Sequence, residues 1–569
     1  MSEVGIDQCA ASTSHRGRAT GLAVGAVLVI SAALVFTKDI GVGGFRWGDT
    51  PSHAMDGVLI HDWLAGGPEA WVRPVAFAER QYAHYPTLSI GRTYPPGFAI
   101  FEALFFALLG VSAGVARLTT ACFGVAAVAG AYLVGGRFLS RVGAVCAAVA
   151  LLTMPMVVLW TRQTMLEMPT LAVLIWLTYA VQMYLAKPTW LRCSAVVILL
   201  LASCLFKQTA VFIVPVVGVI MVVQAWRRVI PWRQFIVSSV AVGVPVAGMF
   251  VLTLQSGGCA THLLEVVTQG NGVSGWATWA SLRYYPAALR GQIGSLLVAA
   301  AIAGFVVSMR RFDWDWGLML LWFASLMVML TFIQHKEPRY LFFACFPIAM
   351  WAGLAVDRVF GMFRRKLVPG AVLACASTWL LAQAYVQPIG YRPDYGELVA
   401  ANADKIRGRI VFFEGRRDGD FIFAVRARLG PRRAVIVRGS KILYSCAADT
   451  RWRYESYVRD EAEVGEALDR FGFSALFVER EPVTNAAEIG LLQAYLASTS
   501  TYGRVGSRVL TAGGIGQACT SRAVDVYVPQ TPIERTARFV EIPLPIASQS
   551  IRVDLDALMA ELEARLQAG

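Results

Sequence analysis

Eleven runs of about 16 to 21 mostly apolar residues constrain the fold of this chain more than any other feature. A hydrocarbon core about 30 Å thick needs roughly 20 apolar residues per helix, so each run has the length of a transmembrane helix. The runs cover residues 20–37, 117–134, 142–160, 169–186, 192–207, 209–226, 234–254, 291–309, 315–333, 339–357 and 367–386. The first lacks the small-residue cleavage site of a signal peptide. The pattern predicts a polytopic α-helical membrane protein with about 11 transmembrane helices.

Charge divides the chain into two parts. Residues 390–569 hold 24 of the 51 Lys and Arg and 23 of the 38 Asp and Glu, whereas residues 1–389 hold 27 and 15. The whole chain is 56% hydrophobic with a mean hydropathy of +0.54, which excludes an ordinary soluble protein. The basic surplus lies between the apolar runs, where it sets topology, so we expect no nucleic-acid partner. We expect a cytoplasmic N-terminus (1–19), a transmembrane domain (20–389) with a long outer loop (38–116), and a C-terminal soluble α/β domain.

The run from Pro95 to Gly110 decides the orientation, because it is short and contains Glu102. If it does not span and the N-terminus is cytoplasmic, every short basic loop lies in the cytoplasm, as the positive-inside rule requires. We therefore expect residues 95–110 to be a re-entrant or interfacial segment in a multi-pass protein of the plasma (inner) membrane. The segments then expected outside the cytoplasm are 38–116, 161–168, 207–208, 255–290, 334–338 and everything after about 387, which makes the C-terminal domain extracytoplasmic.

Short apolar strands alternate with helical segments in residues 390–569, which predicts an α/β fold. The expected strands are 409–414, 434–438, 474–479 and 523–528, and the expected helices are 420–429, 461–471, 486–497 and 554–566. The sequence contains no G-x-G-x-x-G motif or P-loop, so nucleotide binding has no support. Cys446 and Cys519 are either a disulfide or two buried free thiols.

The first outer loop opens with an acidic residue that suits general-base catalysis. Asp49 precedes a helix expected over residues 51–65, on which His53 and Asp56 share one face. A carboxylate just outside the membrane can take the proton of an acceptor hydroxyl. Two alternatives stay open: Asp49 caps the helix N-terminus, or it joins His53 and Asp56 in a metal site.

Three further residues are candidates at the membrane edge. Glu167 lies in an outer turn and is either solvated there or functional. Lys207 ends an apolar run, where its ammonium either snorkels to the interface or binds a lipid-linked phosphate. Arg92 precedes a Pro-Pro pair and is another phosphate candidate.

The segment from His335 to Tyr340 gathers three potential cations and a tyrosine at one membrane edge. We interpret Lys336, Arg339 and Tyr340 as an anion site, because Arg suits bidentate phosphate contacts. The alternative is a simple interfacial anchor made of Arg339 and Tyr340. A cluster of aromatic residues lies in the loop 255–290 and consists of Trp276, Trp279, Tyr284 and Tyr285. These side chains either stack on sugar rings or lipid, or form an interfacial belt, and we favour the belt.

Taken in order, these residues resemble the motifs of the C-type glycosyltransferases, particularly the branch of protein O-mannosyltransferases and lipid A aminoarabinose transferases. The matching positions are Asp49 in RWGDT, Tyr94-Pro95-Pro96-Gly97-Phe98, GRFLSR at 136–141, Arg162 with Glu167, Lys207, and Arg339-Tyr340 with Pro347. The resemblance covers about residues 20–390 and implies a membrane enzyme that transfers a sugar.

The residues and the resemblance together predict an inverting glycosyltransferase. It would move a sugar from a polyprenyl-phosphate donor to a hydroxyl-bearing acceptor (protein, glycolipid or polysaccharide) at the outer face of the membrane. The expected catalytic residues are Asp49, as the base, and Glu167, as an orienting acid. The expected substrate-binding residues are Arg92, Lys207, Lys336, Arg339, Tyr340 and His53. No cofactor is required, although a divalent metal stays open, and the alternative function is a transporter or flippase of a lipid-linked or anionic solute.

Overall fold

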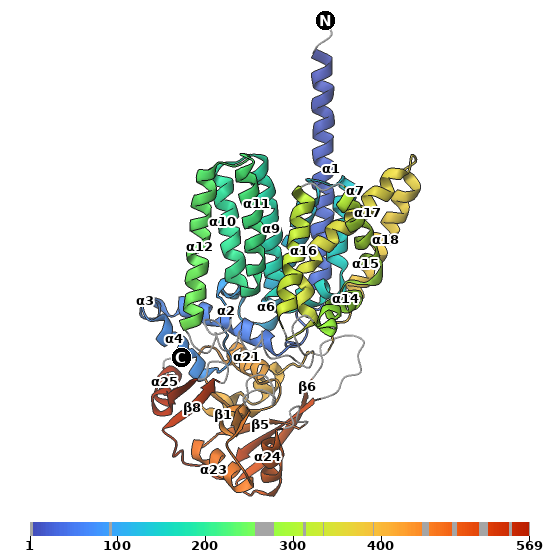
Figure 1. Cartoon of the computed structure of the whole chain (residues 1–569). Helices are drawn as coiled ribbons and strands as arrows, with labels where there is room; N and C mark the ends of the chain where they lie inside the picture. The colour runs from blue at the N-terminus through green and yellow to red at the C-terminus, as the bar shows by residue number, and fades with distance from the viewer. Residues whose placement is uncertain are drawn as a thin grey trace. The chain divides into compact units, whose positions relative to one another are not determined.

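The computed structural model divides the chain into two compact units. It describes residues 4–89, 94–255, 278–310, 314–333, 335–390, 392–445, 454–480, 486–510, 522–544 and 549–567. The first unit, called the helical unit below, comprises Met1–Ile40, Arg117–Val251 and Leu264–Gln387. The second, called the mixed unit, comprises Gly41–Ala116, Leu252–Leu263 and Pro388–Gly569. Figure 1 labels many of the elements of both units.

The helical unit consists of helices that coincide with the expected spans. They are α1 (Val4–Thr37), α6 (Ala113–Gly135), α7 (Arg141–Thr153) with α8 (Pro155–Thr161), α9 (Glu167–Ala186), α10 (Trp190–Phe206), η1 (Gln208–Phe212) with α11 (Ile213–Trp226), α12 (Trp232–Gln255), α14 (Trp279–Ile293) with α15 (Ser295–Arg310), α16 (Trp314–Phe332), η2 (Pro338–Ala344) with α17 (Cys345–Met362), and α18 (Leu367–Val386). Within the described ranges, seven helices are long and apolar enough to cross a membrane, or up to nine if each of two bent pairs is one span. Each of the eleven apolar runs falls on one of these helices or pairs, which confirms the polytopic helical fold.

Polar and special residues between the apolar runs begin and bend the helices. The side chains of Ser140, Thr189 and Thr278 each accept a bond from the backbone N–H three residues on and so cap α7, α10 and α14. Pro155 holds the preceding residue in an extended conformation, and α7 and α8 meet at 60°. Gly294, with φ +98°, allows the 120° bend between α14 and α15.

Close helix packing in this unit depends on glycine where α15 meets α17. A Cβ at Gly304 would lie 1.8 Å from the carbonyl oxygen of Trp351, so no side chain fits there. We expect Gly304→Ala to lower the free energy of unfolding in detergent by about 1–3 kcal/mol, because α15 must move away from α17. Gly218→Ala in α11 is the control, since a Cβ there meets nothing within 4 Å. Equal thermal unfolding midpoints for the two variants would contradict the close contact.

A five-stranded sheet, in the order β2-β1-β5-β7-β6, forms the centre of the mixed unit. The strands are β1 (Ile410–Glu414), β2 (Val435–Arg438), β5 (Ala475–Glu479), β6 (Tyr502–Leu510) and β7 (Arg522–Pro529). β2, β1 and β5 are parallel, and β7 runs antiparallel to β5 and β6. β1 and β5 are buried along their whole length, as expected of parallel strands covered on both faces. The four expected strands are confirmed as β1, β2, β5 and β7.

Helices and short strands complete this α/β fold. The expected helices are confirmed as α21 (Asp418–Leu429), α23 (Glu461–Phe471), α24 (Ala487–Ser498) and α25 (Leu555–Gln567). Further elements are α19 (Gly396–Ala401), α20 (Ala403–Ile406), α22 (Gly439–Ile442), and the antiparallel pairs β3 (Tyr444–Ser445) with β4 (Glu455–Ser456) and β8 (Phe539–Leu544) with β9 (Gln549–Asp554).

The first long loop folds into the mixed unit together with the C-terminal segment. Its helices are α2 (Asp49–Ala65), α3 (Gly67–Trp71), α4 (Pro74–His84) and α5 (Gly97–Leu109). Asp62 on α2 forms a buried ion pair with Arg426 on α21, and its Oδ2 accepts a hydrogen bond from Gln81 Nε2 at 3.0 Å. The Tyr85 hydroxyl donates to the carbonyl of Gly430 at 2.9 Å. Loop and C-terminal segment therefore share one core.

Helix α5 forms most of the run from Pro95 to Gly110. The expected orientation of the protein in the membrane depends on whether this run spans the bilayer. Helix α5 has 13 residues and rises about 20 Å, which is shorter than a hydrocarbon core. It packs against α2, where a Cβ at Gly57 would lie 2.5 Å from Cβ of Glu102. Glu102 is fully buried in this contact. The length of α5 excludes a full span.

Candidate functional site

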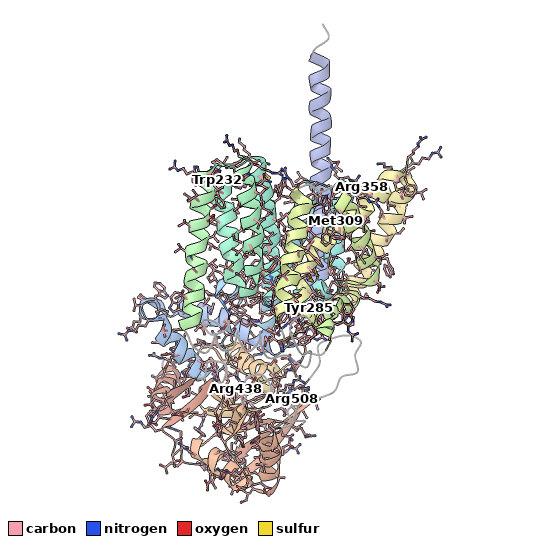
Figure 2. All side chains as sticks on the ribbon, viewed as in Figure 1. Trp232, Tyr285, Met309, Arg358, Arg438 and Arg508 are labelled. Atoms are coloured by element: carbon pink, nitrogen blue, oxygen red, sulfur yellow. The ribbon has the colours of Figure 1, made fainter. Side chains whose placement is uncertain are left out.

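Several turns that the sequence analysis placed on one side lie together at one end of the helical unit. The Arg162 guanidinium joins the ends of three helices there, because it donates to the carbonyls of Val35 at 2.7 Å, Ala384 at 3.1 Å and Gln387 at 3.0 Å. η2 contacts α8, α9, α14 and α16 at the same end. In Figure 2, Tyr285 lies toward this end of the unit, whereas Trp232 and Arg358 lie toward the other. The candidate residues of the helical unit are therefore gathered at one end.

Glu167 and Lys207 form a buried ion pair at this end. Glu167 begins α9, Lys207 follows the last residue of α10, and Lys207 Nζ lies 2.6 Å from Glu167 Oε1. The side chains are 1% and 8% exposed, so Glu167 is not solvated and Lys207 does not snorkel. Glu167 Oε2 accepts no hydrogen bond from the residues that the structure describes. Arg339 acts on the same carboxylate as a second positive charge.

Lys336 is buried and engaged with the end of a helix. Its Nζ donates to the carbonyls of Leu330 at 2.6 Å and Thr331 at 3.1 Å, near the C-terminus of α16, where a cation is favourable. The ammonium also lies 5.5 Å from the centre of the Tyr285 ring. Only 1% of the residue is exposed. Lys336 therefore has a structural role in addition to any role in binding.

Glu337 organises the remaining polar residues of this segment. It forms an ion pair with Arg339 and lies 2.9 Å from His335 Nε2. The Arg339 guanidinium also lies 5.8 Å from the centre of the Tyr340 ring. The structure thus brings Arg339 and Tyr340 together, and it links Arg339 electrostatically to the Glu167–Lys207 pair.

In the mixed unit, Asp49 is the first residue of α2 rather than its cap. Gly48 occupies the N-cap position and makes no side-chain bond, so the capping interpretation is wrong. Thr50 closes the turn instead, because its hydroxyl donates to the carbonyl of Trp47 at 2.6 Å. Asp49 is exposed. Its carboxylate is therefore presented at the first turn of a helix without being required for the helix to begin.

His53 and Asp56 are buried one and two turns further along α2. Asp56 accepts from the backbone N–H of Ser89 at 2.8 Å and also from the Ser89 hydroxyl. The His53 ring packs edge-on against the Tyr94 ring, with 4.8 Å between the ring centres. Among the described residues, no three His, Cys, Asp or Glu side chains form a group that could hold a metal, so the metal interpretation of Asp49, His53 and Asp56 has no support. Arg92, Trp276, Cys446 and Cys519 lie outside the described residues.

Comparison with known proteins shows which family and which solved structures the chain is similar to. Residues 93–250 match the family model described as Dolichyl-phosphate-mannose-protein mannosyltransferase. The structure resembles ArnT from Cupriavidus metallidurans in the apo state, with a TM-score of 0.58 and 15% identity over 90% of this chain and 98% of that one. The chain therefore has the fold of ArnT, and residues 93–250 are similar to the mannosyltransferase family. No curated protein matches its sequence.

Two further solved structures share the fold of this chain. ArnT from C. metallidurans bound to undecaprenyl phosphate gives a TM-score of 0.54 and 13% identity, over 88% of this chain and 97% of that one. The Archaeoglobus fulgidus oligosaccharyltransferase in the apo form gives 0.51 and 12% identity, over 80% and 69%. At these identities the structures show a common fold, which confirms the expected C-type architecture.

The mixed unit holds charged residues that the sequence analysis did not single out. They lie at the carboxyl ends of β1 and β5, which end in Glu414 and Glu479. The Tyr444 hydroxyl donates to Glu414 at 3.1 Å, and Asp420 on α21 accepts from the backbone N–H of Phe45 at 2.9 Å. The signal in the sequence is the run EGRRDGD, which begins at the last residue of an expected strand.

Burial makes these carboxyl groups weak acids. It raises the pKa of Glu414 to about 8 and that of Asp420 to about 7, and it also raises the pKa of Glu479. The folded chain therefore binds more protons than the unfolded chain between about pH 4 and pH 8. The stability that these groups contribute is complete below about pH 4 and is lost as the pH rises through 7 to 8.

We expect the thermal unfolding midpoint of the full chain in detergent to fall between pH 5 and pH 8 because of these groups. Asp420→Asn and Glu414→Gln should each flatten the profile, since an amide does not titrate. Asp62 serves as a contrast, because ion pairing and hydrogen bonding lower its pKa and its titration lies below this range. The same pH slope in wild type and both amide variants would contradict the assignment.

Proposed function

We propose that this protein is a glycosyltransferase that moves a sugar, with inversion, from a polyprenyl-phosphate donor to a hydroxyl group of a protein, glycolipid or polysaccharide. The match of residues 93–250 to a family described by a dolichyl-phosphate-linked sugar carries the proposal. ArnT, which shares the fold, binds undecaprenyl phosphate. Dolichyl and undecaprenyl phosphates are both polyprenyl phosphates, so a donor of this class fits both findings.

Asp49 is proposed as the general base. Its exposed carboxylate takes the proton of the acceptor hydroxyl while the oxygen attacks the anomeric carbon. The bond from that carbon to the phosphate oxygen breaks, and its electron pair leaves with the polyprenyl phosphate. A phosphate leaving group needs little protonation, so a single carboxylate suffices for this displacement.

The cations of the helical unit are proposed to bind the donor phosphate and to stabilise its developing charge. Lys207 and Arg339 are the principal candidates. Lys207 forms an ion pair with Glu167, and the positive charge of Arg339 acts on the same carboxylate, so Glu167 positions both cations. Glu167 is then a positioning residue. Lys336, Tyr340, His53 and Arg92 remain proposed contacts to the substrates.

The reaction is proposed to occur at the non-cytoplasmic face of the plasma membrane. The positive-inside rule supports this orientation, because it assigns the basic loops to the cytoplasm. Single-cysteine variants at two exposed positions, Asp49 and Pro338, labelled in intact cells by a membrane-impermeant reagent, should both react. Labelling of only one of the two would overturn the assignment.

A transfer assay tests the function itself. The purified full-length chain is incubated in detergent with a polyprenyl-phosphate sugar radiolabelled in the sugar and with a crude membrane acceptor fraction. An enzyme releases polyprenyl phosphate and labels the acceptor, whereas a transporter or flippase leaves the donor intact. Intact donor in the presence of folded protein would contradict the proposal.

A further inference from the structure

Four arginines lie near one another where β1 and β5 end in the mixed unit. The backbone N–H of Arg416 donates to Glu479 Oε2 at 3.0 Å, and Arg522 Nη1 lies 3.8 Å from the same oxygen. The charge of Arg417 acts on both Arg416 and Arg46. Arg46 is held in place by donating to the carbonyl of Ile389. These residues, Arg46, Arg416, Arg417 and Arg522, are called the arginine cluster below.

The position of the arginine cluster is one where α/β sheets bind ligands. The connection after β1 leads through α21 to β2 on one side of β1, whereas β5 lies on the other side. The carboxyl ends of β1 and β5 therefore flank a topological switch point, outside which ligands bind in open α/β sheets. The last residues of both strands, Glu414 and Glu479, are buried.

The positive charge of the cluster is only weakly compensated. Within the described residues, Arg522–Glu479 at 3.8 Å is the one ion pair that involves any of its four members. Nε and Nη1 of Arg417 are buried and have no hydrogen-bond partner among those residues. Burial raises the pKa of Glu479 and of Asp420, which weakens these neighbouring carboxyl groups as counter-charges. By contrast, Arg438 is matched by an ion pair with Asp418.

The arginine cluster adjoins the helix that carries Asp49. Arg46 lies three residues before Asp49, and the backbone N–H of the neighbouring Phe45 is bound by Asp420 at 2.9 Å. A Cβ at Gly419 would lie 2.7 Å from Cγ of Pro51, so α21 touches the first turn of α2. The loop that contains Arg416 and Arg417 thus leads directly to the start of the helix with the proposed base.

We infer that the arginine cluster binds an oxyanion, a phosphate or carboxylate group, of a substrate that reacts at Asp49. Guanidinium groups suit this chemistry, because they donate two parallel hydrogen bonds to such a group. The oxyanion belongs either to the acceptor, which is then acidic, or to the lipid-linked donor, whose phosphate would then be bound here rather than by Lys207 and Arg339. The inference rests on the proposed function for the identity of Asp49, but binding to the cluster can be measured without any reaction.

Binding of inorganic phosphate to the full-length chain in detergent tests the cluster. Isothermal titration should show that Arg417→Met weakens phosphate binding at least tenfold and that Arg417→Lys weakens it less. Arg508→Met is the matched control, because it removes one exposed arginine of the same unit, seen in Figure 2, and should leave binding unchanged. Equal weakening by Arg417→Met and Arg508→Met, or none by either, would overturn the inference. Thermal unfolding of each variant verifies that it is folded.

Competition identifies the source of the oxyanion. Displacement of phosphate by farnesyl phosphate assigns the cluster to the donor, and displacement by trigalacturonate assigns it to an acidic acceptor. Displacement by neither compound would overturn the inference. If the protein transfers sugar but Arg417→Met leaves phosphate binding unchanged, the inference about the arginine cluster is refuted and the proposed function stands. If Arg417→Met weakens phosphate binding but the protein transfers no sugar, the proposed function is refuted and the inference about the arginine cluster stands.

Discussion

Asp49→Asn should lower kcat for sugar transfer by about 10²–10⁴-fold and leave KM for the donor nearly unchanged. The amide keeps the size of the side chain but cannot accept the proton of the acceptor hydroxyl. Asp49 is exposed at the start of α2, and the N-cap position belongs to Gly48, so the substitution should not disturb the helix. Release of polyprenyl phosphate from a radiolabelled donor measures the rate.

Glu69→Gln provides the matched control for this experiment. Glu69 is also an exposed acidic residue in the first turn of a helix, in α3 of the same unit. It has no proposed role, so its variant should transfer sugar at the wild-type rate. Wild-type transfer by folded Asp49→Asn protein would show that another group, or none, removes the proton.

The fold of the helical unit could be predicted because apolar length alone specifies a transmembrane helix. Parallel strands such as β1 and β5 could be predicted equally well, because strands that are buried on both faces have continuous apolar sequences. β6 was not predicted, because its centre is exposed and glycines interrupt its pattern. The packing of the first loop with the C-terminal segment depends on pairs such as Asp62 with Arg426, which are 364 residues apart and leave no local signal.

Candidate residues could be named from the sequence, but their partners could not. The start of α2 was expected at Pro51, since proline suits a first turn, whereas the Thr50 hydroxyl closes the turn and lets the helix begin at Asp49. Glu167 and Lys207 each had a plausible role in isolation. Their pairing depends on the antiparallel contact of α9 with α10, which a single sequence does not specify.

Breaking the Glu167–Lys207 pair should cost about 3–5 kcal/mol of unfolding free energy for either single substitution. Glu167→Gln leaves a buried ammonium without its counter-charge, and Lys207→Met leaves a buried carboxylate. Thermal or denaturant unfolding in detergent measures the loss. Arg508→Met breaks an exposed ion pair with Glu397 and should cost less than about 1 kcal/mol.

The double variant separates the stability of the pair from its proposed role in positioning. Removing both charges eliminates the unpaired group, so Glu167→Gln/Lys207→Met should cost less unfolding free energy than either single variant. If Lys207 binds the donor phosphate and Glu167 positions it, the more stable double variant should still show a raised KM for the donor. A pair that serves stability alone would instead regain wild-type KM along with stability. Additive single effects would show that the two side chains do not interact in the folded protein.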